Sequence, residues 1–239
     1  MNKPQLFLLH FAGGNRYSFQ FLLPQLSAFN VVALELPGRG NRLNEPLLDN
    51  FNEAASDLYQ QVTDRLVAPQ FLIYGHSMGA YLALRIGNML EKSGKYPAGI
   101  VVSGNAGPGI REPGKRNRHL LNREEFIQEL NELGGLPPEL VAHEELFNFF
   151  EPVLRADFKI VELNDIASEP PVRTPIYAIM GSEEKNIADI NNWAKFTTGH
   201  FRSEIWDGNH FFIYRHPGRL ATVFHTCAAQ FAPGLSSTL

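Results

Sequence analysis

The sequence predicts one α/β domain built on a mostly parallel, doubly wound sheet. Short, continuously apolar runs recur along the chain, as is typical of strands that are buried on both faces of a sheet. Longer segments with apolar residues at helical spacing separate these runs, and this alternation is typical of doubly wound folds. A length of 239 residues and a hydrophobic content of 44 % allow one domain with a sizeable core.

Six apolar runs are the expected strands. They are QLFLLH (5–10), NVVALEL (30–36), QFLIYG (70–75), GIVVSG (99–104), PIYAIMG (175–181) and the weaker RSEIWDG (202–208). Between the strands, apolar residues at a spacing of three and four predict helices over 50–67, 78–92 and 188–197.

The segment from about 105 to 172 breaks this alternation, because no strand is evident before 175. It begins with a stretch rich in Gly, Pro and cations and continues with two segments of helical pattern. Asn122 is placed to cap the first helix, and Gly134-Gly135 to end it. We expect this insertion to cover the sheet as a helical lid within a single domain, 1–239.

The composition argues against several classes of protein. A net charge of −4 gives no basic excess for nucleic-acid binding. The sole cysteine, Cys227, cannot form an internal disulfide, which fits a reducing compartment. No signal-peptide pattern and no apolar run of transmembrane length occur. We therefore expect a cytoplasmic protein that is monomeric by default and has no membrane or nucleic-acid partner.

The stretch YGHSMG (74–79) contains the pattern Gly-x-Ser-x-Gly, with Ser77 at its centre. Ser77 directly follows a predicted strand and directly precedes a predicted helix, which is the setting of a nucleophilic serine on a sharp turn. Gly75 and Gly79 leave room where side chains would clash. The alternative is a glycine-bounded turn with a capping serine. We expect Ser77 to act as a nucleophile at the carboxyl end of the sheet.

A serine nucleophile needs a base, and the chain order expected here is serine, acid, histidine. His210 follows the last predicted strand and is the expected base, whereas we expect His76 to be a packing residue of the turn. The acid should lie in SEEKNIADI, after the strand over 175–181. A carboxylate in this loop would orient the imidazole of the histidine. Glu184 is the first candidate and Asp189 the second. Solvated loop charges are the alternative interpretation.

Negative charge that develops on a substrate oxygen requires two backbone N–H donors, which form an oxyanion hole. Met78 follows the nucleophile and is the expected first donor. The second donor should come from the loop HFAGGNRYSF, where Ala12 is the best candidate. An ordinary turn is the alternative there, since no Gly-x-Gly-x-x-Gly or Walker pattern for phosphate binding is present.

Five stretches in this order resemble the successive signatures of one enzyme family: FAGGNRYSF, LPGRGNR, YGHSMGAYLA, VLRADFKIVE and GNHFF. That family is the type II (external, editing) thioesterases of non-ribosomal peptide and polyketide synthesis, and the resemblance spans about residues 7 to 212. It implies an α/β-hydrolase fold with Ser77 as nucleophile and His210 as base. The family usually has Asp at the position of Glu184, so this chain departs from the pattern at the acid.

The resemblance also implies a substrate and a partner. These enzymes hydrolyse acyl or aminoacyl thioesters on the phosphopantetheine arm of acyl or peptidyl carrier proteins, and clear mis-primed and stalled groups. A serine acyl-enzyme would form, without a metal or a cofactor of the enzyme's own. Cations in the inserted segment are candidates for a rim that steers acidic carriers, although a solvated loop is the simpler interpretation. These cations are Arg111, Lys115, Arg116, Arg118 and His119.

Three other functions remain open at this stage. The chain could be a medium-chain acyl-carrier-protein thioesterase or a cytoplasmic carboxylesterase of the same fold. It could also be a non-catalytic binding module. Arg39, in LPGRGNR, is most simply expected to pair locally within its turn.

Overall fold

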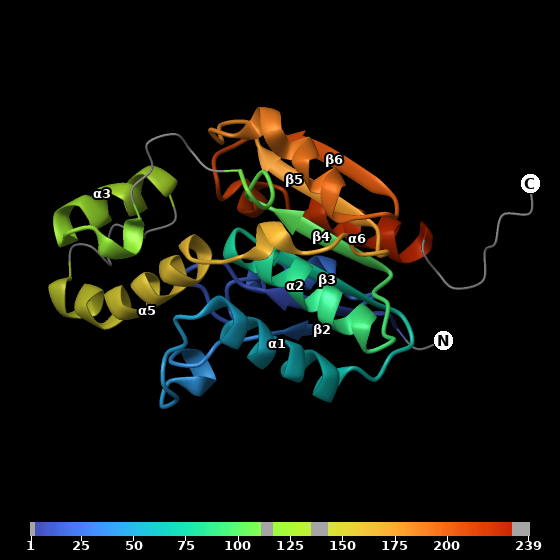
Figure 1. Cartoon of the computed structure of the whole chain (residues 1–239), viewed down its shortest axis with the longest axis horizontal. Coiled ribbons are helices and arrows are strands. Elements are labelled where there is room, and N and C mark those ends of the chain that lie inside the picture. Colours follow the sequence, from blue (N-terminus) through green and yellow to red (C-terminus); the bar gives the residue numbers. More distant parts are fainter. Residues whose placement is uncertain (1–2, 111–116, 135–142, 231–239) are drawn as a thin grey trace, which may run out of the picture.

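A computed structural model describes residues 3–110, 117–134 and 143–230, and six strands form one sheet in it (Figure 1). The strands are β1 (Gln5–Leu9), β2 (Asn30–Ala33), β3 (Phe71–His76), β4 (Gly99–Ser103), β5 (Ile176–Gly181) and β6 (Phe201–Trp206). Their order is β2-β1-β3-β4-β5-β6, and every neighbouring pair is parallel. The predicted doubly wound sheet is confirmed, and each expected apolar run overlaps one strand.

The helices alternate with the strands as expected. The α-helices are α1 (Phe51–Arg65), α2 (Met78–Lys92), α3 (Arg123–Leu133), α5 (Glu144–Glu162) and α6 (Pro217–Gln230). The 3-10 helices are η1 (Gln20–Gln25), η2 (Gly40–Arg42), η3 (Arg118–Leu120), η4 (Ile166–Ser168), η5 (Ile187–Phe196) and η6 (Phe212–Arg215). The helix expected over 188–197 is therefore present, but it is η5 and has the tighter 3-10 hydrogen-bond pattern.

The sheet is covered on both faces, which explains why the inner strands β1, β3, β4 and β5 are buried at every position. Phe7 and Leu9 of β1 pack with the apolar sides of α1 and α2. Leu6 and Leu8, which alternate with them, pack on the opposite face with η1 and α6. Successive side chains of a strand point to opposite faces, so a strand between two helical layers needs apolar residues throughout.

The insertion between β4 and β5 contains η3, α3, α5 and η4. Figure 1 shows α3 and α5 together at one end of the sheet, and these helices share a small apolar core of their own. The predicted cap is confirmed, since the Asn122 side chain accepts a hydrogen bond from the N–H of Glu125 at 3.0 Å. Gly134 ends α3 in the left-handed conformation at φ +75°, whereas Gly135 lies outside the described residues. The role as a lid stays a prediction.

The length and apolar character of the helices bear on whether any of them could span a membrane. Within the described ranges, none of them combines the length and the apolar character that crossing a bilayer requires.

The backbone of α2 passes very close to β1 at Gly79. A Cβ atom at this position would lie 2.3 Å from the carbonyl oxygen of Leu9, and a strand carbonyl cannot move aside as a flexible side chain does. We expect Gly79→Ala to lower the free energy of unfolding by about 3 kcal/mol, measured by urea denaturation. Ala80→Gly, one residue on, is the control and should cost about 1 kcal/mol through helix propensity. Equal losses in the two variants would contradict this account.

Candidate active site

Ser77 lies on a strained turn between β3 and α2. Its φ of +55° is the only positive φ of a non-glycine residue in the described chain. A Cβ atom on Gly75 would lie 1.9 Å from the carbonyl oxygen of Gly79, so the turn depends on glycine there. The N–H of Ser77 donates to the carbonyl of Ser103 at 2.7 Å, and Asn105 Nδ2 donates to the carbonyl of Ser77 at 2.9 Å. Strain of this kind persists where surrounding contacts enforce it, as it does at functional sites.

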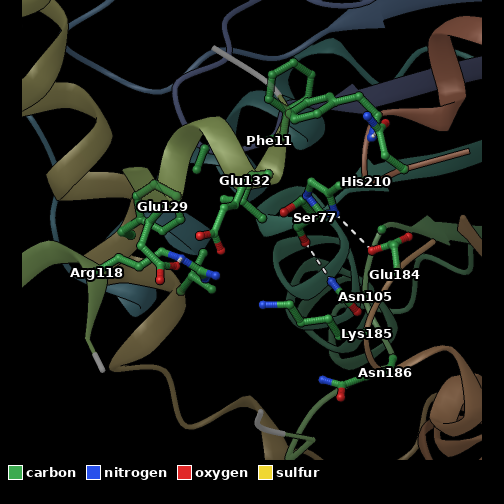
Figure 2. A pocket seen from close by; sticks show the side chains of 18 of the residues that line it. Phe11, Ser77, Asn105, Arg118, Glu129, Glu132, Glu184, Lys185, Asn186 and His210 are labelled. Carbon is green, nitrogen blue, oxygen red and sulfur yellow. Dashed lines mark hydrogen bonds and ion pairs between the residues drawn. The ribbon is translucent and has the colours of Figure 1, made fainter. Parts of the chain in front are cut away.

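His210 and Glu184 form a hydrogen-bonded pair beside Ser77 (Figure 2). An ionised carboxylate only accepts hydrogen bonds, so His210 Nδ1–H donates to Glu184 Oε2, at 3.0 Å. The other oxygen, Oε1, accepts the N–H of Gly181 at 2.8 Å, which fixes the orientation of the carboxylate. Both side chains are largely buried, at 15 % and 10 % exposure. In the neutral imidazole this bond places the proton on Nδ1, so Nε2 carries the lone pair that a general base requires.

The loops that carry the acid and the histidine are joined at the carboxyl ends of β5 and β6. The N–H of Glu183 donates to the carbonyl of Gly208 at 3.0 Å. Gly181 allows the two loops to approach, because a Cβ atom there would lie 2.4 Å from the carbonyl oxygen of Asn209. The extra methylene of glutamate is accommodated because Glu184 folds back onto the end of its own strand.

The second candidate for the acid lies elsewhere. Asp189 is exposed on η5 and does not line the cavity that contains His210. Of the other late histidines, His216 Nε2 shares a hydrogen bond with the carbonyl of Asp207, and His225 is exposed on α6. The structure thus brings Ser77 and His210 together with Glu184 and leaves these alternatives apart.

His76 is a packing residue of the turn, as expected, and it lies directly against the base. Its ring centroid is 5.1 Å from that of His210, and its Nδ1 shares a hydrogen bond with Ser103 Oγ at 2.8 Å. Burial, and then the charge on nearby His210, lower the pKa of His76 well below its usual value. The neutral state of His76 therefore avoids repulsion with an imidazolium that forms on His210.

The two expected oxyanion donors lie at the same end of the sheet. Ala12 lines the cavity, and Met78 begins α2, where the helix dipole favours negative charge. Within the described part of the chain, neither backbone N–H donates a hydrogen bond to a protein acceptor. Both donors are therefore available to a substrate oxygen.

A cavity of about 330 Å³ joins these groups to the inserted segment. Ser77 and His210 line it from the sheet, and Leu154 and Phe158 of α5 line it from the insertion. Figure 2 shows Arg118 across the cavity from the serine and the histidine. Leu154 and Phe158 therefore belong both to the apolar core of the insertion and to the cavity wall.

The proposed basic rim is wrong for the two cations that the structure describes. Arg118 is 7 % exposed and its Nε donates to Glu129 at 2.8 Å. His119 Nδ1 pairs with Glu162 at 2.6 Å, and both side chains are under 10 % exposed. Arg118 is paired with half-buried Glu129 and His119 with buried Glu162, so neither side chain presents an unpaired cation at the surface. The remaining cations, 111–116, lie outside the described residues.

Sequence reasoning missed two features of the site. Asn105 lines the cavity and holds the Ser77 carbonyl, but a lone asparagine after a strand carries no signal of that role. The expectation that Arg39 pairs locally is wrong, because it forms a buried ion pair with Asp157, 118 residues away. Only the approach of α5 to the loop after β2 creates that contact.

Among the described residues, no group of three His, Cys, Asp or Glu is arranged to hold a metal ion.

Buried His10 makes the stability of the protein depend on pH. Burial, and then Arg39, lower the pKa of His10 from 6.5 to about 4. Between these values the unfolded chain binds a proton that the folded protein does not, so stability falls as the pH falls. Wild type should lose about 2 kcal/mol more than His10→Gln between pH 7 and pH 4.5, measured by urea denaturation. Parallel losses in the two proteins would contradict this assignment.

Comparisons with known proteins agree with the site. The thioesterase domain family model matches residues 4–230. Linear gramicidin dehydrogenase LgrE of Brevibacillus parabrevis is 30 % identical over 236 residues, which cover 96 % of this chain and 89 % of that protein. Gramicidin S biosynthesis protein GrsT of Aneurinibacillus migulanus is 31 % identical over 218 residues, with coverage of 89 % and 84 %.

A solved structure shows the same fold over the whole domain. YbtT, described as a type II thioesterase from the yersiniabactin non-ribosomal peptide and polyketide pathway, is 28 % identical. It superimposes with a TM-score of 0.87 and covers 97 % of this chain and 95 % of its own. Together with the parallel sheet, the family match identifies the chain as a member of the thioesterase domain family, with an α/β-hydrolase fold, and as a hydrolase that acts on thioesters.

Proposed function

We propose that this thioesterase removes mis-primed or stalled acyl and aminoacyl groups from the phosphopantetheine arm of carrier proteins in non-ribosomal peptide or polyketide synthesis. The observation that carries the chemistry is the bond from His210 to Glu184, in the cavity that also contains Ser77. The assignment of the pathway draws support from YbtT, whose description places it in a non-ribosomal peptide and polyketide pathway, and from GrsT, whose name places it in gramicidin S biosynthesis.

In the first half of the reaction, Ser77 Oγ attacks the thioester carbonyl while His210 Nε2 takes its proton. Glu184 stabilises the imidazolium that results, and the N–H groups of Ala12 and Met78 receive the developing oxyanion. Collapse of the tetrahedral intermediate breaks the C–S bond and leaves the acyl group as an ester on Ser77. The departing sulfur receives the proton that His210 took from Ser77, which returns His210 to its neutral form for the second half. Because a thiolate is already a good leaving group, this proton transfer matters less than it would for an amide.

In the second half, water attacks the acyl-enzyme and His210 removes its proton. The same two N–H groups receive the oxyanion, and Ser77 leaves with the proton that His210 returns. The cavity volume of about 330 Å³ is at the small end of ligand sites, which favours short acyl groups.

The substrate assignment is tested with a panel of carriers loaded with acetyl, aminoacyl and long-chain groups. We expect faster release of acetyl and aminoacyl groups from carriers than hydrolysis of the matching free esters. Preference for the free esters would favour a carboxylesterase, and preference for medium chains would favour release of fatty acids.

The name of LgrE specifies a dehydrogenase, so a parallel reaction with NADPH and the same loaded carriers should be included. Oxidation of the nucleotide would overturn hydrolysis as the reaction.

The nucleophile is tested separately from the substrate. A fluorophosphonate should label wild type at Ser77, and Ser77→Ala should lose both the label and turnover. Ser103→Ala is a matched control, because Ser103 bonds Tyr74 and His76 beneath the site and does not line the cavity. The Ser103→Ala variant should still be labelled by the fluorophosphonate. A wild-type enzyme that takes no label would favour a non-catalytic binding module.

The acid is tested by comparing two isosteric substitutions. Glu184→Gln should lower kcat on an acyl carrier by about 10²- to 10⁴-fold, because the amide no longer holds His210 in the right tautomer or stabilises its charge. Asp189→Asn should change kcat less than twofold, since Asp189 is exposed and outside the cavity. The reverse order of effects would reassign the acid to Asp189.

A further inference from the structure

A buried ion pair joins two segments that lie 118 residues apart in the chain. Arg39 follows β2, and Asp157 lies in the second half of α5. Arg39 Nη1 and Nη2 donate to Asp157 Oδ2 and Oδ1 at 2.6 and 2.8 Å. The two side chains are 5 % and 0 % exposed. This two-bond geometry fixes the carboxylate in the plane of the guanidinium.

The same carboxylate also holds the loop that supplies the second oxyanion donor. The N–H of Gly13 donates to Asp157 Oδ2 at 2.7 Å, and Arg39 Nη1 donates to the carbonyl of Gly14 at 3.3 Å. A bond at the N–H of Gly13 orients the peptide plane that begins at Ala12 Cα, and the N–H of Ala12 lies in the preceding plane. The carbonyl of that preceding plane belongs to Phe11, and it accepts the N–H of Gly14 at 2.9 Å. The ion pair thus contacts the loop at the residues next to the donor.

A second residue of α5 contacts this loop. Gly13 has a φ of +77°, and a Cβ atom there would lie 2.4 Å from Leu154 Cδ2. Leu154 and Asp157 are three residues apart on the helix and therefore present the same face to the loop. The loop is held by a close apolar contact and by a hydrogen bond, both from the inserted segment.

Stability alone does not account for a charged pair at this position. Desolvation of two buried charges offsets much of their attraction, and an apolar pair of similar volume is often at least as stable. An apolar pair, however, offers no acceptor to the N–H of Gly13. The particular contribution of Asp157 is therefore an oriented acceptor, and that of Arg39 is to hold the acceptor in place.

We propose that Asp157, held by Arg39, is a positioning residue for the reaction: the ion pair holds the backbone of Gly13 and Gly14, and the bond from the N–H of Gly14 to the Phe11 carbonyl carries this constraint to the peptide plane of the Ala12 N–H, which is thereby aimed at the substrate oxyanion. This inference rests on the proposed function, because it takes Ala12 as an oxyanion donor. Through this contact α5 is part of the framework of the active site as well as a wall of its cavity.

The test compares two double variants that both remove the buried ion pair. Arg39→Met with Asp157→Asn keeps an oxygen that can accept the N–H of Gly13, whereas Arg39→Met with Asp157→Leu keeps none. We expect kcat on an acetyl carrier to be about 10- to 100-fold lower in the second variant than in the first. KM should differ less than twofold, because the interaction lost acts on the transition state.

Thermal unfolding of both double variants measures any structural effect alongside catalysis. Equal kcat values, or a difference confined to KM, would overturn the positioning role while leaving the proposed function intact. A wild-type enzyme that does not hydrolyse the acetyl carrier would instead overturn the proposed function. The two failures are therefore distinguishable.

A milder pair of variants covers the case in which a double variant does not fold. Arg39→Lys keeps the charge but not the two-bond geometry, and we expect it to lower kcat about 5-fold with KM unchanged. Arg42→Lys is the matched control, because Arg42 also makes two-bond pairs, with Glu45 and Asp57, away from the loop. Its kcat should stay within twofold of wild type. Equal kcat in the two lysine variants would overturn the proposal.

Discussion

The site depends on the close approach of three backbone segments around Ser77. Gly75 and Gly79 touch across the turn, and Gly79 also contacts the end of β1 at Leu9. Only hydrogen atoms fit between these segments, so β1 ends directly beside the turn and its following loop brings Ala12 to the cavity. The positive φ of Ser77 is sustained by this packing and by the hydrogen bonds of its backbone to Ser103 and Asn105. The positions of Ser77, Met78 and Ala12, which we propose as nucleophile and oxyanion donors, thus follow from one packing constraint.

The inserted helices complete the site at the end of the sheet where they lie. One buried ion pair, Arg39–Asp157, connects this segment to the rest of the fold, and a second, His119–Glu162, joins two elements within it. Asp157 reaches the loop after β1, and Glu162 holds η3 through His119. Because removal of one partner leaves an uncompensated buried charge, such pairs specify where the segment sits more than they stabilise it. The same segment therefore shapes the cavity and orients the loop beside the nucleophile.

The histidines illustrate how burial assigns different roles to one residue type. His10 and His76 are buried and stay neutral near pH 7, because desolvation lowers their pKa values. His210 keeps a carboxylate partner and contact with the cavity, so it is the histidine placed to carry a proton. The position of His210 after the last strand predicted it as the base. The packing explains why His10 and His76 are not placed for that role, because both are buried.

By itself the sequence determined the order of strands and helices, the turn at Ser77 and the histidine after the last strand, since hydrophobic period and glycine spacing are local properties. It also placed Glu184 and Asp189 in the loop after β5 and ranked Glu184 first. Of the two, the tertiary structure places Glu184 in hydrogen-bond contact with His210 and Asp189 outside the cavity. It alone paired Arg39 with Asp157 and buried Arg118 and His119. Contacts between residues far apart in the chain leave no local pattern, so only the packed fold shows that Asp157 meets Gly13.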